Sequence, residues 1–261
     1  MTPPKNTPKT TPESILITGA SSGIGAALAL AYAGGGVTLA LTGRNESRLG
    51  AIAEACRERG AVVNATLLDV REKEKMQECV LAADDAAPLD LVIANAGLSG
   101  GTGGGGEADS QARAIFAVNV DGVLNTIFPA IKRMEPRGHG QIALMSSLSG
   151  FRGFPGAPAY SASKAAIRVY AEALRGAYHG HGIDISVICP GFVESRMTAV
   201  NNYKMPFLMS AERAASIIQR GLARNKARIP FPFPTYFLSW FLGSLPPALT
   251  DPLFRMLPKK E

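Results

Sequence analysis

The chain has 261 residues, of which 46% are hydrophobic and 18% charged, enough to bury a sizeable core in one α/β domain. The net charge of +6 is scattered among acidic residues, as in "REKEKMQE", and this absence of a basic stripe argues against a nucleic-acid-binding protein. No uninterrupted apolar run reaches the roughly 18 residues of a membrane span, and "MTPPKNTPKTTPES" lacks the apolar core of a signal peptide. We therefore expect a cytoplasmic protein.

The predicted elements begin at Ser14, after a tail (residues 1–13) whose Pro, Thr and Lys content predicts disorder. Short apolar stretches then alternate with segments of helical spacing, such as 48–59 and 160–178. Strands are expected at 14–20, 37–43, 61–70, 90–97, 141–147 and 184–191, with a seventh candidate at 227–231. Strands that are apolar on both faces and joined by helices predict a doubly wound parallel α/β sheet in a single domain, about 14–230. Such sheets bind ligands beyond the carboxyl ends of their strands.

The first strand leads into "TGASSGIG" (18–25) and then into an apolar helix. Glycines at this turn let the chain fold tightly and let a pyrophosphate approach the free N–H groups of the helix N-terminus. The spacing is GxxxGxG, and a glycine-rich turn alone is also typical of simple close packing. In its strand–turn–helix context it predicts a dinucleotide site formed by Gly19, Ser21, Ser22, Gly23, Ile24 and Gly25.

The end of the second strand bears on which dinucleotide binds. Arg44, in "LTGRNESR", stands where an acidic residue would hold the ribose hydroxyls of NAD, or just after it. Because a guanidinium suits a phosphate, we expect NADP rather than NAD; the alternative is a solvated arginine at a strand end.

The third and fourth strands also end in residues suited to a cofactor. Asp69 and Val70 end the third strand, and Asn95, Ala96 and Gly97 end the fourth. Short polar side chains there can bond the adenine or the backbone, and a glycine lets the cofactor pass closely. The glycine-rich stretch 99–106 that follows is expected to be a flexible loop.

Tyr160 and Lys164 lie four residues apart and therefore on one face of the predicted helix 160–178. A nearby ammonium should lower the pKa of the tyrosine and make the pair an acid–base catalyst near neutral pH. Ser146 or Ser147, at the end of the fifth strand, could hold a substrate oxygen beside the tyrosine.

Other chemistries fit less well. The histidines His139, His179 and His181 occur in glycine-flanked loops without convincing partners, so no metal is expected. The three cysteines, an odd number without metal-ligand spacing, are interpreted as reduced thiols.

Taken together, "TGASSGIG", "NAG", "YSASK" and "PG" resemble, in order and over about 14–228, the classical short-chain dehydrogenase/reductase family. The resemblance implies a Rossmann-type sheet, NAD(P), no metal and a homodimer or homotetramer. It implies that Tyr160 is the catalytic acid/base and that Lys164 lowers its pKa and binds the nicotinamide ribose. It further implies that Ser147, thirteen residues before the tyrosine, orients the substrate, and that Asn119 holds a water for proton relay.

The segment "CPGFVESRM" also matches the family, with Pro190, Gly191 and Val193 facing the nicotinamide. Ser195 stands in place of the usual threonine and keeps its hydroxyl. The residues that follow, to about Pro206, resemble a substrate loop, and their apolar character favours a lipophilic substrate.

The expected function is therefore NADPH-dependent reduction of a ketone or aldehyde to an alcohol, with an apolar substrate favoured. One alternative is an NAD-dependent alcohol or hydroxysteroid-type dehydrogenase that works in the oxidising direction. The other, from a different class, is a non-catalytic cofactor-sensing scaffold.

The C-terminal segment 231–261 is aromatic, and Tyr236, Phe237, Trp240 and Phe241 have helical spacing. A short helix here would be too short to span a bilayer. It is expected to pack over the substrate pocket or in a subunit interface. The alternative is peripheral membrane contact, in which Lys259 and Lys260 would meet lipid charge.

Overall fold

The seven apolar segments form one parallel sheet in the order β3-β2-β1-β4-β5-β6-β7, as predicted. The structure is a computed structural model that describes residues 11–103 and 105–256, so most of the predicted tail and the lysines at 259 and 260 lie outside the described residues. The strands are β1 (Ser14–Thr18), β2 (Thr38–Gly43), β3 (Val62–Leu67), β4 (Leu91–Ala94), β5 (Gly140–Met145), β6 (Ile183–Pro190) and β7 (Arg228–Phe231). Since β3 and β4 end earlier than predicted, Asp69 and Asn95 lie in the turns beyond them, where side chains face the sheet edge.

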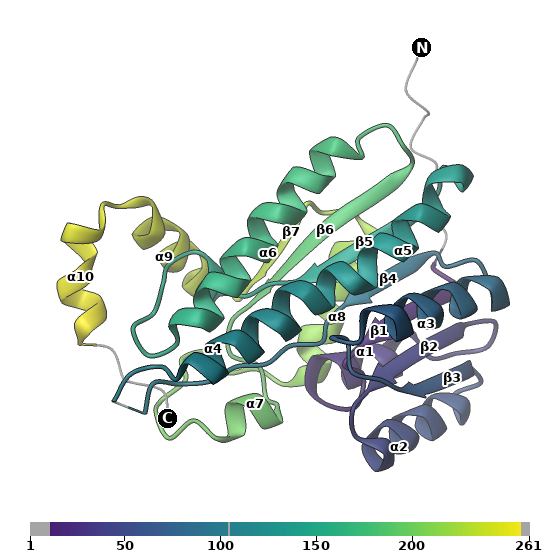
Figure 1. Cartoon of the computed structure of the whole chain (residues 1–261), viewed down its shortest axis with the longest axis horizontal. Helices are drawn as coiled ribbons and strands as arrows, with labels where there is room; N and C mark the ends of the chain where they lie inside the picture. Colours follow the sequence, from purple (N-terminus) through teal and green to yellow (C-terminus); the bar gives the residue numbers. More distant parts are fainter. Residues whose placement is uncertain (1–10, 104, 257–261) are drawn as a thin grey trace.

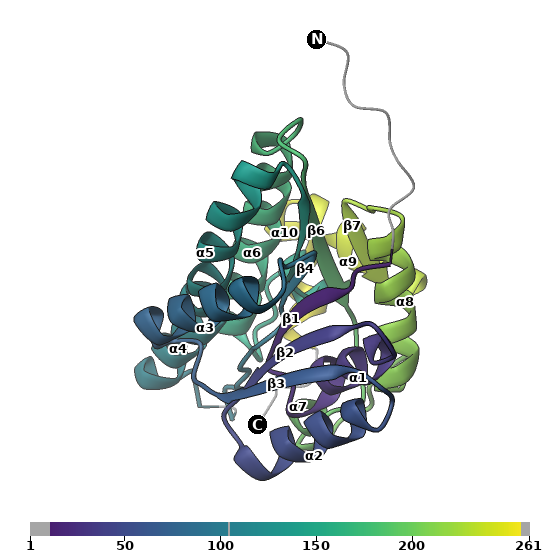
Figure 2. The same ribbon diagram turned by 90° about the vertical axis from the view of Figure 1, so that its right-hand side faces the viewer.

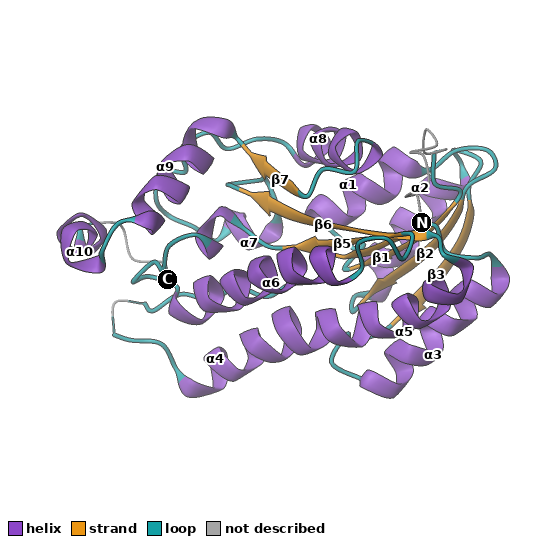
Figure 3. Cartoon of the chain, turned by 90° about the horizontal axis from the view of Figure 1, so that it is seen from above, coloured by secondary structure: helices purple, strands orange, loops and turns teal. Residues whose placement is uncertain are grey.

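Helices cover both faces of this sheet, which is why its strands are apolar on both sides (Figures 2 and 3). One face packs against α1 (Gly23–Tyr32), α2 (Glu46–Arg57) and α8 (Ala211–Ala223). The other packs against α3 (Lys73–Ala86), α5 (Gly122–Arg137) and α6 (Pro158–Ala177). The remaining helices are α4 (Asp109–Phe116), the π-helical turn η1 (Ala117–Asp121), the 3-10 turn η2 (Leu148–Gly150), α7 (Arg196–Ala199), α9 (Phe233–Ser244) and α10 (Pro247–Arg255).

Two helices begin earlier than their predicted starts, for local reasons. The side chain of Asn45 caps α2 by accepting a hydrogen bond from the backbone N–H of Arg48 at 3.0 Å, which draws the start of α2 to Glu46. Pro158 occupies the first turn of α6, where its missing N–H costs nothing.

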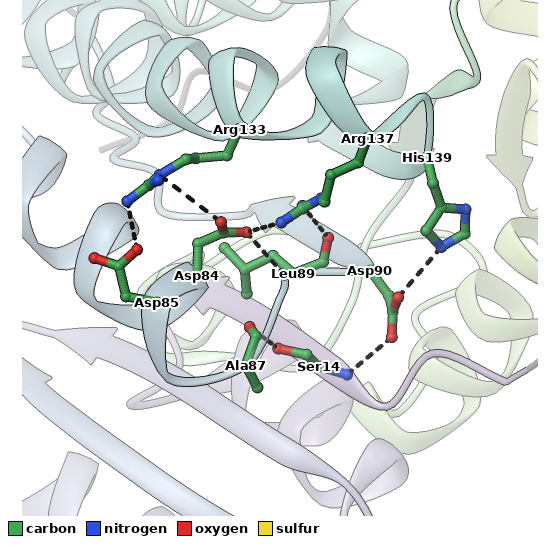
Figure 4. A network of polar contacts seen from close by, with 9 residues as sticks. All are labelled: Ser14, Asp84, Asp85, Ala87, Leu89, Asp90, Arg133, Arg137 and His139. Atoms are coloured by element: carbon green, nitrogen blue, oxygen red, sulfur yellow. Dashed lines mark hydrogen bonds and ion pairs between the residues drawn. The ribbon is translucent and has the colours of Figure 1, made fainter.

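The amino edge of the sheet is held together by a buried ionic network (Figure 4). Asp84, only 7% exposed, accepts hydrogen bonds from the backbone of Leu89 at 2.9 Å and from Arg137 at 2.7 Å. Asp90 accepts from the backbone N–H of Ser14 at 3.1 Å and faces His139 at 3.3 Å. These contacts tie α3 and α5 to the start of β1 and β4, at the edge opposite the strand ends where ligands bind.

The continuous helix 109–137, formed by α4, η1 and α5, is long and apolar enough to cross a membrane by length and composition alone. Half of its apolar window is buried inside the protein, as in a core helix of a folded domain. It is the only described helix that passes this test, and it is weak evidence for a membrane span.

The last two helices, α9 and α10, lie beyond the carboxyl ends of the strands (Figure 1, yellow). The polypeptide order reverses between β1 and β4, the switch point at which doubly wound sheets bind ligands.

Candidate active site

A cavity of about 930 Å³ opens at the carboxyl ends of the strands. It brings together the residues that the sequence singled out, with the exception of Asn119. Those that line it are Gly19, Ser21, Ser22, Gly23, Ile24, Gly25, Arg44, Asp69, Val70, Asn95, Ala96, Gly97, Ser146, Ser147, Tyr160, Lys164, Pro190, Gly191, Val193 and Ser195.

The glycine turn after β1 forms a concave cradle at one end of the cavity. A Cβ on Gly25 would lie 2.4 Å from the carbonyl oxygen of Gly19, so only glycine fits there. Gly19 itself has a φ of +68°, and Asn95 fixes the turn by donating from its side chain to the carbonyl of Thr18 at 2.8 Å. The side chain of Ser22 makes no capping bond to the described residues, so the first amides of α1 remain available to an anion. The cradle therefore fits the pyrophosphate of a dinucleotide.

Arg44 and Arg48 line the cavity beyond β2, at the end where the adenosine of a dinucleotide would lie. Arg44, whose side chain is 56% exposed, lies 3.6 Å from Asp69, and that carboxylate is held chiefly by Arg71 at 2.7 Å. The hydrogen bond from Arg71 is the main reason why the pKa of Asp69 is lowered. Arg44 is thus only loosely paired and can turn towards a ligand.

Arg48 is a site residue that the sequence reasoning missed. It lines the cavity beside Arg44, and its buried Nε finds no hydrogen-bond partner in the part of the chain that the structure describes. It also lies in the first turn of α2, where the helix dipole disfavours a cation unless an anion is near. The available signal was its spacing, four residues after Arg44. The orphaned Nε fits a cofactor with an additional phosphate.

The catalytic candidates meet where β5 ends and α6 begins. Ser147 and Tyr160 share a hydrogen bond, and Lys164 donates from Nζ to the carbonyl of Met145 at 2.9 Å, 5.8 Å from the centre of the Tyr160 ring. Ser146 instead donates to the backbone carbonyl of Lys164 at 2.7 Å, a structural role. This geometry supports Ser147 as the serine that meets substrate.

The electrostatics of the pair differ from the expectation. Burial raises the pKa of Tyr160, and only the hydrogen bond from Ser147 lowers it; Lys164 is not among the causes. Burial also lowers the pKa of Lys164 to about 8. The predicted lowering of the tyrosine pKa by the lysine is therefore not found: the ammonium is directed at the carbonyl of Met145, and burial raises the pKa of the phenol.

Asn119 lies behind the cavity wall, in the π-helical turn η1, and is fully buried. Its Oδ1 accepts from the backbone N–H of Leu98 at 2.7 Å, and its Nδ2 donates to the carbonyl of Leu98 at 2.9 Å and to Ser163 at 3.0 Å. A Cβ on Gly97 would lie 3.4 Å from Oδ1 of Asn119 and 3.5 Å from Nζ of Lys164, so the asparagine adjoins the lysine. Its side chain holds the loop after β4 in place.

The other end of the cavity has apolar walls. Ser195 caps the short helix α7 by accepting from the backbone N–H of Thr198 at 3.2 Å, so its hydroxyl serves the loop that follows β6. Further wall residues, which the sequence did not identify individually, come from the loop before α6, the loop after β6 and the C-terminal helices: Phe154, Phe192, Tyr203, Leu238, Leu242, Leu253 and Phe254. The cavity therefore joins a polar cofactor end to an apolar substrate end.

Comparison with known proteins agrees with this architecture. Residues 13–206 match the family model described as short chain dehydrogenase. An uncharacterised oxidoreductase of Myxococcus xanthus is 38% identical over 93% of this chain and 96% of its own length. Two solved structures share the fold at 23% identity: a short-chain dehydrogenase from Sphingobium yanoikuyae in complex with NADPH (TM-score 0.77, 95% of this chain and 97% of that one) and a short-chain dehydrogenase/reductase from Burkholderia phymatum in complex with NAD (TM-score 0.80, 95% and 96%).

Proposed function

Because this chain belongs to the short-chain dehydrogenase family, whose members are NAD(P)-binding oxidoreductases, we propose that it uses NADPH to reduce an apolar ketone or aldehyde to an alcohol. The observation that carries the proposal is the convergence of Ser147, Tyr160 and Lys164 on one cavity with a dinucleotide cradle at one end and apolar walls at the other.

In this reaction the nicotinamide supplies a hydride to the carbonyl carbon. Tyr160 donates its phenolic proton to the carbonyl oxygen, so that C=O becomes CH–OH and a phenolate remains. Since burial raises the pKa of Tyr160, the phenol holds its proton at neutral pH and is ready to act as an acid. Ser147 donates a hydrogen bond to the same oxygen, and the Lys164 ammonium would stabilise the phenolate if it turned from the carbonyl of Met145 towards the tyrosine.

The preference for NADPH rests on the two arginines. Arg44 and Arg48 line the adenosine end of the cavity, and the unpartnered Nε of Arg48 would be satisfied by a phosphate on the ribose. A cofactor without that phosphate would leave the buried Nε unpaired.

The experiment is a titration of the protein with NADPH and with NADH. Trp240 is the only tryptophan in the chain, and α9, which carries it, lines the same cavity, so energy transfer to the nicotinamide reports binding. We expect Arg48→Met and Arg44→Ala each to weaken NADPH binding by roughly tenfold or more, since a hydrogen bond to a charged group is lost, and to leave NADH binding unchanged. Arg113→Met, at an exposed ion pair within α4, is the control.

Two outcomes would contradict the proposal. Tighter binding of NADH than NADPH by the wild type would favour an NAD-dependent alcohol or hydroxysteroid-type dehydrogenase. A Tyr160→Phe protein that keeps full turnover of a carbonyl substrate would remove the tyrosine from the mechanism.

We also propose a cytoplasmic homodimer that pairs through α5 and α6. Phe128 on α5 and Val169 on α6 are 45% and 54% exposed, which supports a contact there. Light scattering should give twice the mass of the chain, and a Phe128→Asp/Val169→Asp double variant should be a monomer. A monomeric or tetrameric wild type would contradict this assembly.

A further inference from the structure

Helix α9 is mainly apolar, and yet it lies at the surface. Its sequence, "FPTYFLSWFLGS", contains no charged residue, and none of its residues, all of which the structure describes, is buried. A helix that is apolar all round is normally covered on every side. Something outside the described chain is therefore expected to cover part of α9.

One side of α9 is anchored to the protein. Tyr236 packs edge-on against Phe151 with 5.4 Å between ring centres, and Arg228 donates a hydrogen bond to its hydroxyl at 3.2 Å. Seven residues, or about two turns, later, a Cβ on Gly243 would lie 2.2 Å from the carbonyl oxygen of Phe151, so the helix backbone is pressed against that loop. These contacts fix the rotation of the helix.

A second side lines the active-site cavity. Thr235, Leu238, Ser239 and Leu242, spaced three and four residues apart, form this side. Leu238 is also 55% exposed, so it stands at the mouth, where the cavity meets the exterior.

The third side faces outwards and is aromatic. Phe233, Phe237, Trp240 and Phe241 are exposed by 71%, 52%, 45% and 47%. Phe237 lies 6.1 Å from Trp240 and 6.3 Å from Phe241 between ring centres, which makes the four rings one contiguous face. We call these four residues the aromatic face of α9.

We propose that the aromatic face of α9 docks into the surface of a phospholipid bilayer that contains anionic lipid, and that apolar substrate enters the cavity from the lipid past Leu238. The second part rests on the proposed reduction of an apolar carbonyl; the docking does not. Phe and Trp side chains at one face of a surface helix are typical of interfacial insertion.

The charges around the cavity mouth are complementary to anionic lipid. Arg196 and Lys204 of the substrate loop line the cavity, and the segment 232–256 contains one further basic residue, Arg255, and one acidic residue, Asp251. Asp251 is paired with Arg152 at 2.8 Å, so its charge is compensated. The basic side chains would meet lipid phosphates, whereas a second copy of the chain would present the same positive charge.

The size of the face also favours lipid over a second copy. Four aromatic side chains of about 200 Å² each, roughly half exposed, offer on the order of 400 Å². A stable protein interface takes about 800 Å² from each partner. The dimer proposed above instead uses other exposed side chains, Phe128 of α5 and Val169 of α6.

The test is flotation of the full-length protein with vesicles of phosphatidylcholine, with and without phosphatidylserine, together with the emission of Trp240. We expect the wild type to float with the anionic vesicles and its emission to shift to shorter wavelength. A Phe233→Ser/Phe237→Ser variant keeps the tryptophan as reporter, and it should bind about a hundredfold more weakly, at roughly tenfold for each buried ring. The control is Val62→Ser/Leu67→Ser, which removes similarly exposed apolar side chains from the edge strand β3 and should bind like the wild type.

Turnover separates docking from substrate entry. With a short water-soluble aldehyde, the Phe233→Ser/Phe237→Ser variant should match the wild type, since neither residue lines the cavity. With a long-chain aldehyde dissolved in the vesicles, it should be at least tenfold slower. Equal rates on the vesicle-borne aldehyde would overturn lipid entry.

The remaining outcomes are distinct. A wild type that stays in solution, with unchanged Trp240 emission, overturns docking. A variant whose mass by light scattering falls below that of the wild type overturns it in favour of a second copy. Vesicle binding without turnover of any carbonyl compound would refute the proposed reaction and leave docking supported.

Discussion

Lys164 is nearly inaccessible to solvent, at 3% exposure, and among the described residues its ammonium donates one hydrogen bond, to the carbonyl of Met145. Burial lowers its pKa from 10.5 to about 8. The buried lysine therefore destabilises the folded protein, although the proposed reaction needs it. Lys164→Met, which keeps a side chain of similar length, should make the protein without cofactor more stable. The same variant should be inactive.

The magnitude follows from the pKa difference. A depression from 10.5 to about 8 corresponds to roughly 3 kcal/mol of unfavourable burial of the charged form at pH 7, at about 1.4 kcal/mol per unit. Loss of the bond to Met145 returns about 1 kcal/mol, which leaves a net stabilisation of about 2 kcal/mol. Between pH 8 and 10.5 the unfolded wild-type chain binds more protons than the folded one, so the free energy of unfolding of the wild type rises with pH across this interval. The difference in the free energy of unfolding between Lys164→Met and the wild type should therefore shrink by as much as the wild type gains over this interval.

The assay is urea unfolding of both apo proteins at pH 7 and at pH 9.5, with the comparison made on the difference between variant and wild type. All other titrating groups cancel in that difference. We expect the variant to lead at pH 7 and to lose most of that lead at pH 9.5. A variant that is less stable at pH 7, or a lead that does not change with pH, would show that Lys164 is not held as a costly buried charge.

Three further substitutions test the rest of the architecture. Gly25→Ala should weaken NADPH and NADH binding alike by at least tenfold, because its Cβ would lie 2.4 Å from the carbonyl of Gly19, whereas unchanged affinity would mean that the cradle relaxes freely. Gly50→Ala, in the interior of α2 with no described atom near its Cβ, should instead stabilise the protein by about 1 kcal/mol in thermal unfolding, and a loss of stability would contradict the helix there. Arg137→Met should destabilise the fold by roughly 3 kcal/mol in urea, since it leaves Asp84 buried without its closest cation, while the KM for NADPH stays constant; a neutral result would mean that Arg133 takes over.

The fold could be predicted because its signal is local and repeated. Each strand is a short apolar run, and each is separated from the next by a segment of helical spacing, which leaves a parallel sheet as the consistent arrangement. The motif residues could be placed for the same reason: Gly19 and Arg44 directly follow a strand, Ser147 is the second residue after one, and all carboxyl ends of a parallel sheet meet at one edge.

What could not be predicted depends on burial and on contacts between distant segments. The pKa of Tyr160 is set by how deeply α6 packs, so a rule based on a lysine four residues away gave the wrong direction for the apo protein. The sequence does not distinguish Arg48 from the other charged residues of α2, because the burial of its Nε depends on the packing around the cavity. For the C-terminal helix the sequence left the substrate pocket and a subunit interface open, and only the position of α9 beyond the sheet places Leu242 in the same cavity as Ser147.

The two groups of the site with shifted pKa values are compatible with the proposed reduction. A tyrosine whose pKa is raised by burial rests as the neutral phenol, the form that gives a proton to a carbonyl oxygen. Oxidation of an alcohol would need the phenolate at rest, and in this structure burial opposes that form. A lysine with a pKa of about 8 remains mostly charged at pH 7, and it lies close enough to stabilise the phenolate once the proton has left. In the proposed reaction the cost of burying the ammonium is borne in the resting protein and is offset when negative charge forms on Tyr160.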